Sequence, residues 1–154
     1  MSVPRFWREI PQRYNLKASR CGVCEGMHYP PRRICPTCRR ESVGRMTRTN
    51  LSGRGTVLEW TRVHRPAAGY EAYTPYLLAM VQTEEGPRLI TQLVECEDLD
   101  DDRLEGMPVM ATFRRIGEDG AAGIIHYGVK WRPDPSRDNG TESVLDEDGD
   151  SSKE

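Results

Sequence analysis

The sequence predicts a mainly β protein with a short N-terminal helix, a cysteine-rich ribbon, a five-stranded barrel and a disordered acidic tail. Three observations carry this prediction. Two Cys-x-x-Cys pairs lie between Cys21 and Cys38, and about five short segments of alternating apolar residues lie between Thr56 and Trp131. From Arg132 onward the chain has almost no apolar residues. The predicted divisions are residues 1–48, 49–132 and 133–154 of a 154-residue chain.

The four cysteines Cys21, Cys24, Cys35 and Cys38 have the spacing of a metal site, with ten residues between the two pairs. Each pair can place both sulfurs on one side of a tight turn, and two such turns make a closed tetrahedral site. Four thiolates suit Zn²⁺ and leave no open position for a substrate, so the zinc is expected to be structural. The alternatives are iron and a pair of disulfides, of which disulfides are disfavoured in a reducing cytoplasm.

The N-terminal helix is expected to be short. Pro4 suits a first helical turn, Phe6 and Ile10 fall on one face, and Pro11 is expected to end or kink the helix. Phe6, Trp7 and Ile10 therefore either pack on the ribbon or anchor another protein. Residues 39–41 and 45–50 are expected to form a polar connector between the ribbon and the barrel.

In the second unit, residues 49–132, apolar and polar residues alternate with a period of two. Turns are predicted at Glu84–Gly86 and Gly117–Gly120, and the acidic segment 98–105 is expected to hold one helical turn. This pattern fits an OB-fold, an SH3-like barrel or a small sandwich. The strands are predicted at residues 56–64, 76–82, 88–94, 109–116 and 124–131.

The net charge of −2 conceals a strong asymmetry. Residues 1–50 carry a balance of +8, residues 51–132 carry −4, and residues 133–154 carry −6. A basic first third indicates a nucleic acid, a phosphate-bearing ligand, an acidic protein face or simply a solvated surface. No apolar run approaches the roughly 20 residues of a membrane span, and no signal peptide opens the chain, so we expect a cytoplasmic protein without membrane contact.

Catalytic patterns are missing from the sequence. His28, His64 and His126 lie in unrelated places, and no nucleophile elbow, P-loop or dinucleotide motif is present. Cys96, near a strand end, is expected to be a small buried hydrophobe and not a reactive thiol. The chain alone is therefore predicted not to be an enzyme.

The order of motifs resembles an archaeal and bacterial family that joins a zinc ribbon to an OB-fold and accompanies acyl-CoA enzymes. The most specific parts are Tyr29-Pro30-Pro31-Arg32 between the two knuckles and Gly53-x-Gly55-Thr56-Val57 at the start of the barrel. The resemblance spans about residues 4–131. It implies a rubredoxin-like ribbon, an OB-fold, and a non-catalytic scaffold for a thiolase-family enzyme, with hydroxymethylglutaryl-CoA synthase as a second partner in the mevalonate pathway.

The same resemblance suggests a shared site for a CoA thioester. Tyr70 and Tyr73, in the loop after the first barrel strand, suit a pantetheine arm or a partner's surface, unless they simply cap the barrel. Arg32, Arg33 and Arg65 are candidates for the CoA phosphates.

The alternative function is a module for single-stranded nucleic acid, since ribbons and OB-folds both serve there. The acidic barrel and the lack of basic residues in Tyr76–Gln82 make this alternative the weaker one.

Overall fold

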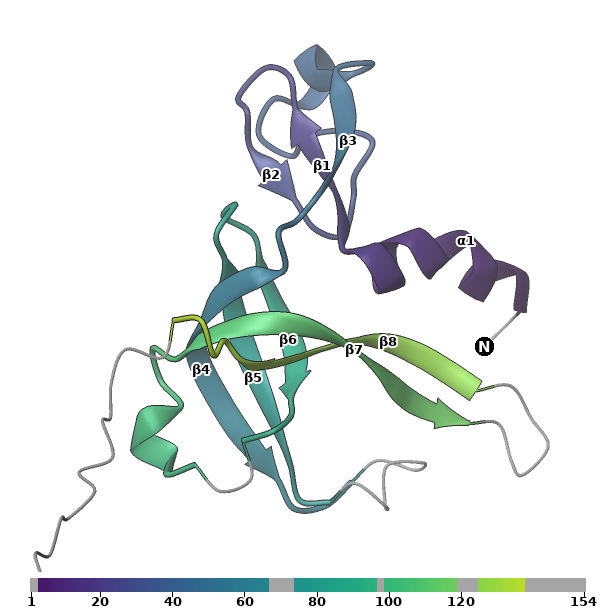
Figure 1. Cartoon of the computed structure of the whole chain (residues 1–154). Helices are drawn as coiled ribbons and strands as arrows, with labels where there is room; N and C mark the ends of the chain where they lie inside the picture. Colours follow the sequence, from purple (N-terminus) through teal and green to yellow (C-terminus); the bar gives the residue numbers. More distant parts are fainter. Residues whose placement is uncertain (1–2, 67–73, 97–98, 119–124, 138–154) are drawn as a thin grey trace, which may run out of the picture.

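The computed structural model describes residues 3–66, 74–96, 99–118 and 125–137 of the chain. These residues form a small ribbon and a closed barrel, with one helix, α1, beside them (Figure 1). The predicted mainly β architecture with a five-stranded barrel is therefore confirmed. The predicted acidic tail, apart from its first residues, and the candidate residues Tyr70 and Tyr73 lie outside the described residues.

Helix α1 runs from Val3 to Asn15 and contains Pro11 in its interior. Of the two effects expected of Pro11, ending the helix is wrong, because the helix continues to Asn15. A proline removes only one backbone donor from a helix, and contacts made by the last turn hold it in place. The Tyr29 hydroxyl donates to the Gln12 carbonyl at 3.2 Å, and Leu16, with φ of 46°, then ends the helix in the left-handed region.

The ribbon is a three-stranded antiparallel sheet in the order β2-β1-β3. Its third strand occupies part of the segment that was predicted to be a polar connector, so that prediction is wrong. In this strand only Met46 and Thr49 are partly buried. Its sequence therefore lacks the alternation of apolar residues by which a strand is predicted. The bounds are β1 Lys17–Cys21, β2 Met27–His28 and β3 Met46–Asn50, with the 3-10 helix η1 at Arg39–Ser42.

The barrel closes in the order β4-β5-β6-β8-β7, with β7 returning to pair with the start of β4. Within the described part of the chain, the single parallel contact joins Leu93 of β6 to Trp131 of β8. All five predicted strands are present. Their bounds are β4 Arg54–Val63, β5 Tyr76–Thr83, β6 Arg88–Leu93, β7 Pro108–Glu118 and β8 Ile125–Pro133, and the predicted acidic turn is the 3-10 helix η3 at Asp101–Arg103.

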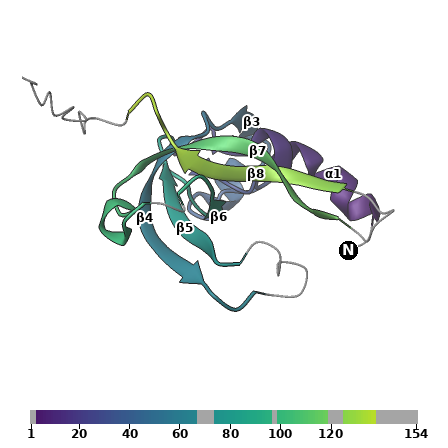
Figure 2. The same cartoon turned by 60° about the horizontal axis from the view of Figure 1, so that its bottom comes forward.

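The predicted turn begins at Gly117, but in the structure strand β7 continues to Glu118. Gly117 and Glu118 still pair with His126 and Ile125, after a shift of register at Arg115. The hairpin of β7 and β8 is consequently long and passes alongside α1, as both views show (Figures 1 and 2). Gly117 was the sequence signal for a turn, but in the structure it lies within β7 next to the bulge.

The barrel core continues into the ribbon. Val57, Val81 and Trp131 are at most 1% exposed and belong to one buried cluster. The same cluster contains Leu16, between α1 and β1, and Leu51, between β3 and β4. The Leu51 amide donates to the Leu16 carbonyl at 3.1 Å, which holds the two ends of the ribbon together at the junction. Cys96 is 2% exposed in the same core, in agreement with its predicted role as a small hydrophobe.

Candidate functional site

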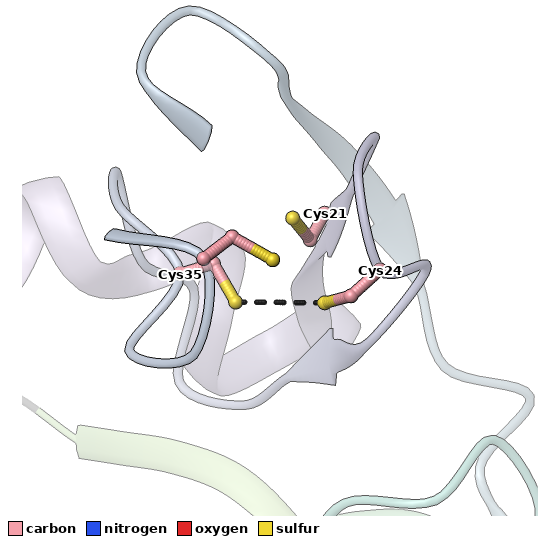
Figure 3. Close-up of side chains that lie close together, drawn as sticks. Cys21, Cys24 and Cys35 are labelled. Carbon is pink, nitrogen blue, oxygen red and sulfur yellow. Dashed lines mark hydrogen bonds between the residues drawn. The ribbon is translucent and has the colours of Figure 1, made fainter. Parts of the chain in front are cut away.

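The four cysteine sulfurs converge at the end of the ribbon. The sulfurs of Cys21, Cys24, Cys35 and Cys38 all lie within 4.8 Å of one another, and those of Cys24 and Cys35 are 3.7 Å apart. Figure 3 shows Cys21, Cys24 and Cys35 pointing toward a common centre. A tetrahedron with zinc–sulfur bonds of about 2.3 Å has edges of about 3.8 Å. The sulfurs therefore lie close to the spacing that Zn²⁺ requires, and none of the four cysteines forms a disulfide bond.

The backbone around the sulfurs is arranged to favour thiolates. The backbone N–H groups of Cys38 and Thr37 lower the pKa of Cys35, and the Val23 amide lies 3.4 Å from the Cys21 sulfur. Hydrogen bonding with the Cys24 sulfur, and then burial, raise the pKa of Cys38 to about 12, because both favour the protonated thiol. A dication at the centre would stabilise the thiolate form of all four cysteines, so the cluster fits a bound metal.

The two knuckles share a backbone signature. Glu25 and Arg39, each directly after the second cysteine of its pair, have φ of 58° and 46°. The left-handed conformation turns the chain back after each pair. Gly22 is also required, because a Cβ there would lie 2.9 Å from the Arg45 carbonyl oxygen.

A basic groove of about 370 Å³ lies between α1 and the ribbon. Its walls hold five cationic side chains and no carboxylate, and none of the five forms an ion pair within the described ranges. The Ser19 hydroxyl at the floor accepts a hydrogen bond from the Arg32 amide at 2.9 Å, which fixes the loop that carries two of the cations. The cationic residues are Arg8, Lys17, Arg32, Arg33 and Arg48.

The candidate arginines are split by the fold. Arg32 and Arg33 line the groove together, whereas Arg65 follows the far end of β4. The sequence reasoning missed Arg8, Lys17 and Arg48, although the balance of +8 in residues 1–50 was the available signal. Only the fold brings these three beside the Pro-Pro-Arg loop.

An exposed aromatic surface lies where α1 meets the β7–β8 hairpin. Phe113 contacts the ring of Tyr14 edge-on at 5.0 Å between centroids and stacks on Tyr127 at 5.5 Å. Phe113 remains 49% exposed and Tyr127 39%. Trp7, two turns before Tyr14 on the same helix face, is 63% exposed. The sequence reasoning selected Trp7 but missed Phe113 and Tyr127, which read as ordinary strand residues.

Among the described residues, no helix has the length and apolar character needed to cross a membrane.

Comparison with known proteins identifies both units. Residues 8–44 match the family model of the ChsH2 rubredoxin-like zinc ribbon domain, and residues 49–114 match that of the ChsH2 C-terminal OB-fold domain. The predicted zinc ribbon and OB-fold are thereby confirmed, with zinc as the expected metal.

Relatives of known description match most of the chain. A DUF35 domain-containing scaffold protein of Methanothermobacter thermautotrophicus is 40% identical over 130 residues, which is 84% of this chain and 94% of that protein. A probable enoyl-CoA hydratase alpha subunit of Thermomonospora curvata is 33% identical over 107 residues, or 68% of this chain and 31% of that protein.

A solved structure has the same arrangement of units. A chain of the Ltp2-ChsH2(DUF35) aldolase superposes with a TM-score of 0.59 at 27% identity, covering 86% of this chain and 96% of that one.

Proposed function

Because this chain belongs to the family of DUF35 domain-containing scaffold proteins, we propose that it is a non-catalytic accessory subunit of an acyl-CoA-processing enzyme. The relative described as a probable enoyl-CoA hydratase alpha subunit supports the acyl-CoA part, and the chain of the Ltp2-ChsH2(DUF35) aldolase supports the presence of an enzyme partner. Within this class we propose a thiolase-family partner, together with hydroxymethylglutaryl-CoA synthase, on the resemblance of the motifs. The cytoplasm, where thiols stay reduced, is the proposed location.

The exposed aromatic surface is the observation that carries the scaffold proposal. Phe113 and Tyr127 stack on the hairpin beside α1, and Trp7 exposes its ring on the helix face that also carries Tyr14, the ring that contacts Phe113. Aromatic side chains of this kind dominate the binding energy of protein interfaces when a partner buries them. A single chain gains nothing from exposing three of them together, whereas an enzyme subunit seated on α1 and the hairpin would bury all three.

The basic groove is the proposed site for the polar end of CoA. Its five cations meet no carboxylate in the groove walls, and CoA carries a diphosphate and a 3′-phosphate. Guanidinium groups bind phosphates through paired, charge-assisted hydrogen bonds. We centre this proposal on Arg32 and Arg33, because Arg65 lies at the other end of β4. The pantetheine role of Tyr70 and Tyr73 stays a prediction.

Co-expression with the thiolase-family enzyme of the same cell, followed by size-exclusion chromatography, tests the scaffold function. We expect one complex, and we expect Trp7→Ala or Phe113→Ala to weaken it by roughly 2 kcal/mol, a value typical of aromatic hot spots. Ile90→Ala is the matched control, since Ile90 is 74% exposed on β6, a strand outside that surface. Separate elution of the wild-type proteins at micromolar concentration would contradict the proposal.

Titration of the complex with CoA and with pantetheine tests the groove. Replacing Arg32 and Arg33 together by Ala should weaken CoA binding by about tenfold or more, because two charge-assisted contacts are lost, and should leave pantetheine unaffected. Arg88→Ala, on the barrel, is the control. Equal CoA affinity of the wild type and the double variant would refute this site. Single-stranded DNA or RNA bound by the groove, with no enzyme partner, would instead support the nucleic-acid alternative.

A further inference from the structure

A histidine side chain lies beside the four cysteines of the ribbon. His28 belongs to the two-residue strand β2, which pairs with β1 so that His28 lies opposite Ser19. The residue is half-buried, and its Nε2 is a buried atom with no hydrogen bond of normal geometry in the described part of the chain. A buried polar atom of this kind costs free energy unless a partner completes its hydrogen bond.

The Nε2 atom of His28 lies next to the sulfurs. A Cβ placed on Gly26 would lie 3.8 Å from Nε2 and 3.3 Å from the Cys24 sulfur, so both atoms border the space that this glycine leaves open. The backbone N–H of Cys38 and, to a smaller extent, the His28 side chain lower the pKa of Cys35, so the ring is close to that thiol as well. The ring therefore lies at the edge formed by Cys24 and Cys35, whose sulfurs are 3.7 Å apart (Figure 3).

A bound metal changes the hydrogen bonding that this edge requires. As free thiols, Cys24 and Cys35 can form a hydrogen bond with each other, with either sulfur as the donor. Metal-bound cysteines are thiolates, which carry no proton and can only accept hydrogen bonds. The bond between the two sulfurs is then lost, and four thiolates around one dication leave an excess of negative charge that N–H donors stabilise.

Cys24 and Cys35 differ in their exposure and in their supply of donors. Cys35 is buried and has backbone N–H groups of its own knuckle beside it, whereas Cys24 is exposed and no N–H group donates to its sulfur among the described residues. We propose that His28 donates its Nε2 proton to the zinc-bound thiolates at the Cys24–Cys35 edge. This hydrogen bond would strengthen zinc binding and make the exposed Cys24 thiolate less reactive toward electrophiles.

Cadmium substitution tests the hydrogen bond directly in the full-length wild-type protein. An NMR-active cadmium isotope in the zinc site couples to protons that are hydrogen-bonded to its sulfur ligands. We expect a through-bond correlation between cadmium and the Nε2 proton of His28, beside the correlations from backbone N–H groups of the two knuckles, which serve as the internal control. If the backbone correlations are present and the His28 correlation is absent, or if Nε2 carries no proton, the proposal is overturned.

Two variants separate the hydrogen bond from simple packing of the ring. His28→Phe keeps a ring without the donor, and it should weaken zinc binding by about tenfold or more in competition with a chelator, as the loss of an outer-shell partner does. Alkylation by iodoacetamide should also release zinc faster from this variant than from the wild type.

His28→Gln supplies an amide N–H in place of the ring N–H, so it should keep most of the wild-type zinc affinity. His64→Phe, at an exposed position after β4, is the matched control and should bind zinc like the wild type. Wild-type affinity in His28→Phe would contradict the proposal. An equal loss in His28→Phe and His28→Gln would also contradict it, because packing of the ring would then account for the histidine.

Discussion

At the scale of single residues, Gly55, in the motif that opens the barrel, occupies a tightly packed position. A Cβ at this position would lie 2.5 Å from the Gln82 carbonyl oxygen and 2.8 Å from a Val81 methyl carbon. Backbone cannot move away as a flexible side chain can, so the approach of β4 to β5 depends on the absence of a side chain here. The glycine of the motif is therefore explained by packing within the barrel.

Gly55→Ala should lower the free energy of unfolding by about 1–3 kcal/mol, as overpacking in a tight core does. Urea unfolding followed by tryptophan fluorescence would measure this loss. Gly117→Ala is the matched control, because a Cβ at Gly117 meets nothing within 4 Å. Equal unfolding midpoints for the two variants would show that the close approach of β4 and β5 is not a constraint.

At the scale of elements, barrel closure depends on a short contact between β6 and β8. The Leu93–Trp131 pair is extended by the Val94 amide, which donates to the Trp131 carbonyl at 2.8 Å. Glu95 then joins the end of β6 to both strands of the long hairpin through Arg114 and Arg132. This carboxylate reinforces the part of the barrel with the fewest backbone pairings.

Glu95→Gln should lower the free energy of unfolding at neutral pH. It should also make that free energy less dependent on pH in the acidic range. Hydrogen bonding from Arg114, and then from Arg132, holds the pKa of Glu95 below its ordinary value of 4.5. The stabilisation that the Glu95 carboxylate provides is therefore fully present above its ordinary pKa of 4.5 and is lost as the pH falls through the lowered pKa. The side chain is 45% exposed, which limits the effect to at most about 1 kcal/mol.

Unfolding curves between pH 7 and pH 3 would measure the effect of Glu95→Gln, with Glu59→Gln, at an exposed position on β4, as the control. The difference between Glu95→Gln and the wild type should shrink as the solution becomes acidic. A difference that stays constant over this range would mean that the carboxylate charge does not fasten the hairpin.

At the scale of the whole molecule, a metal-dependent ribbon is attached to a barrel that has its own core. Cys35→Ser should unfold the ribbon, since structural zinc contributes roughly 10–16 kcal/mol of apparent binding energy in small zinc-binding peptides. Hydrogen exchange should then show β1 and β3 unprotected while β5 and β6 remain protected. Metal analysis of the wild type should find one zinc per chain, and less than about half would contradict the assignment.

The effect of Cys35→Ser on the stability of the barrel shows whether the ribbon and the barrel fold together or independently. Leu16 and Leu51 belong to the shared buried cluster, so loss of the ribbon should also lower the melting temperature of the barrel. Unchanged barrel stability in Cys35→Ser would show that the two units fold independently of each other.

Most of the architecture could be predicted from the sequence because it depends on patterns among residues that are close together in the chain. Cysteine spacing defines the metal site, and alternation defines the five barrel strands. Strand β3 was missed because it is held by pairing with β1 and buries almost no apolar side chain. The groove was only partly predicted, because Arg8, Lys17 and Arg48 meet Arg32 through folding and not through spacing. Likewise, the exposure of Phe113 and Tyr127 follows from the length of the hairpin beyond the barrel.

Helix α1 belongs to two surfaces at once. It contributes Arg8 and Gln12 to the wall of the basic groove, and Trp7 and Tyr14 to the aromatic surface. A subunit that binds this helix would therefore hold one wall of the basic groove in place, and CoA bound in the groove would hold the helix that the subunit contacts. Where both events hold the helix in one position, thermodynamic reciprocity requires each to strengthen the other by the same factor. A scaffold that works as we propose would hold its enzyme partner most tightly when CoA is present, and so would assemble in response to the supply of CoA.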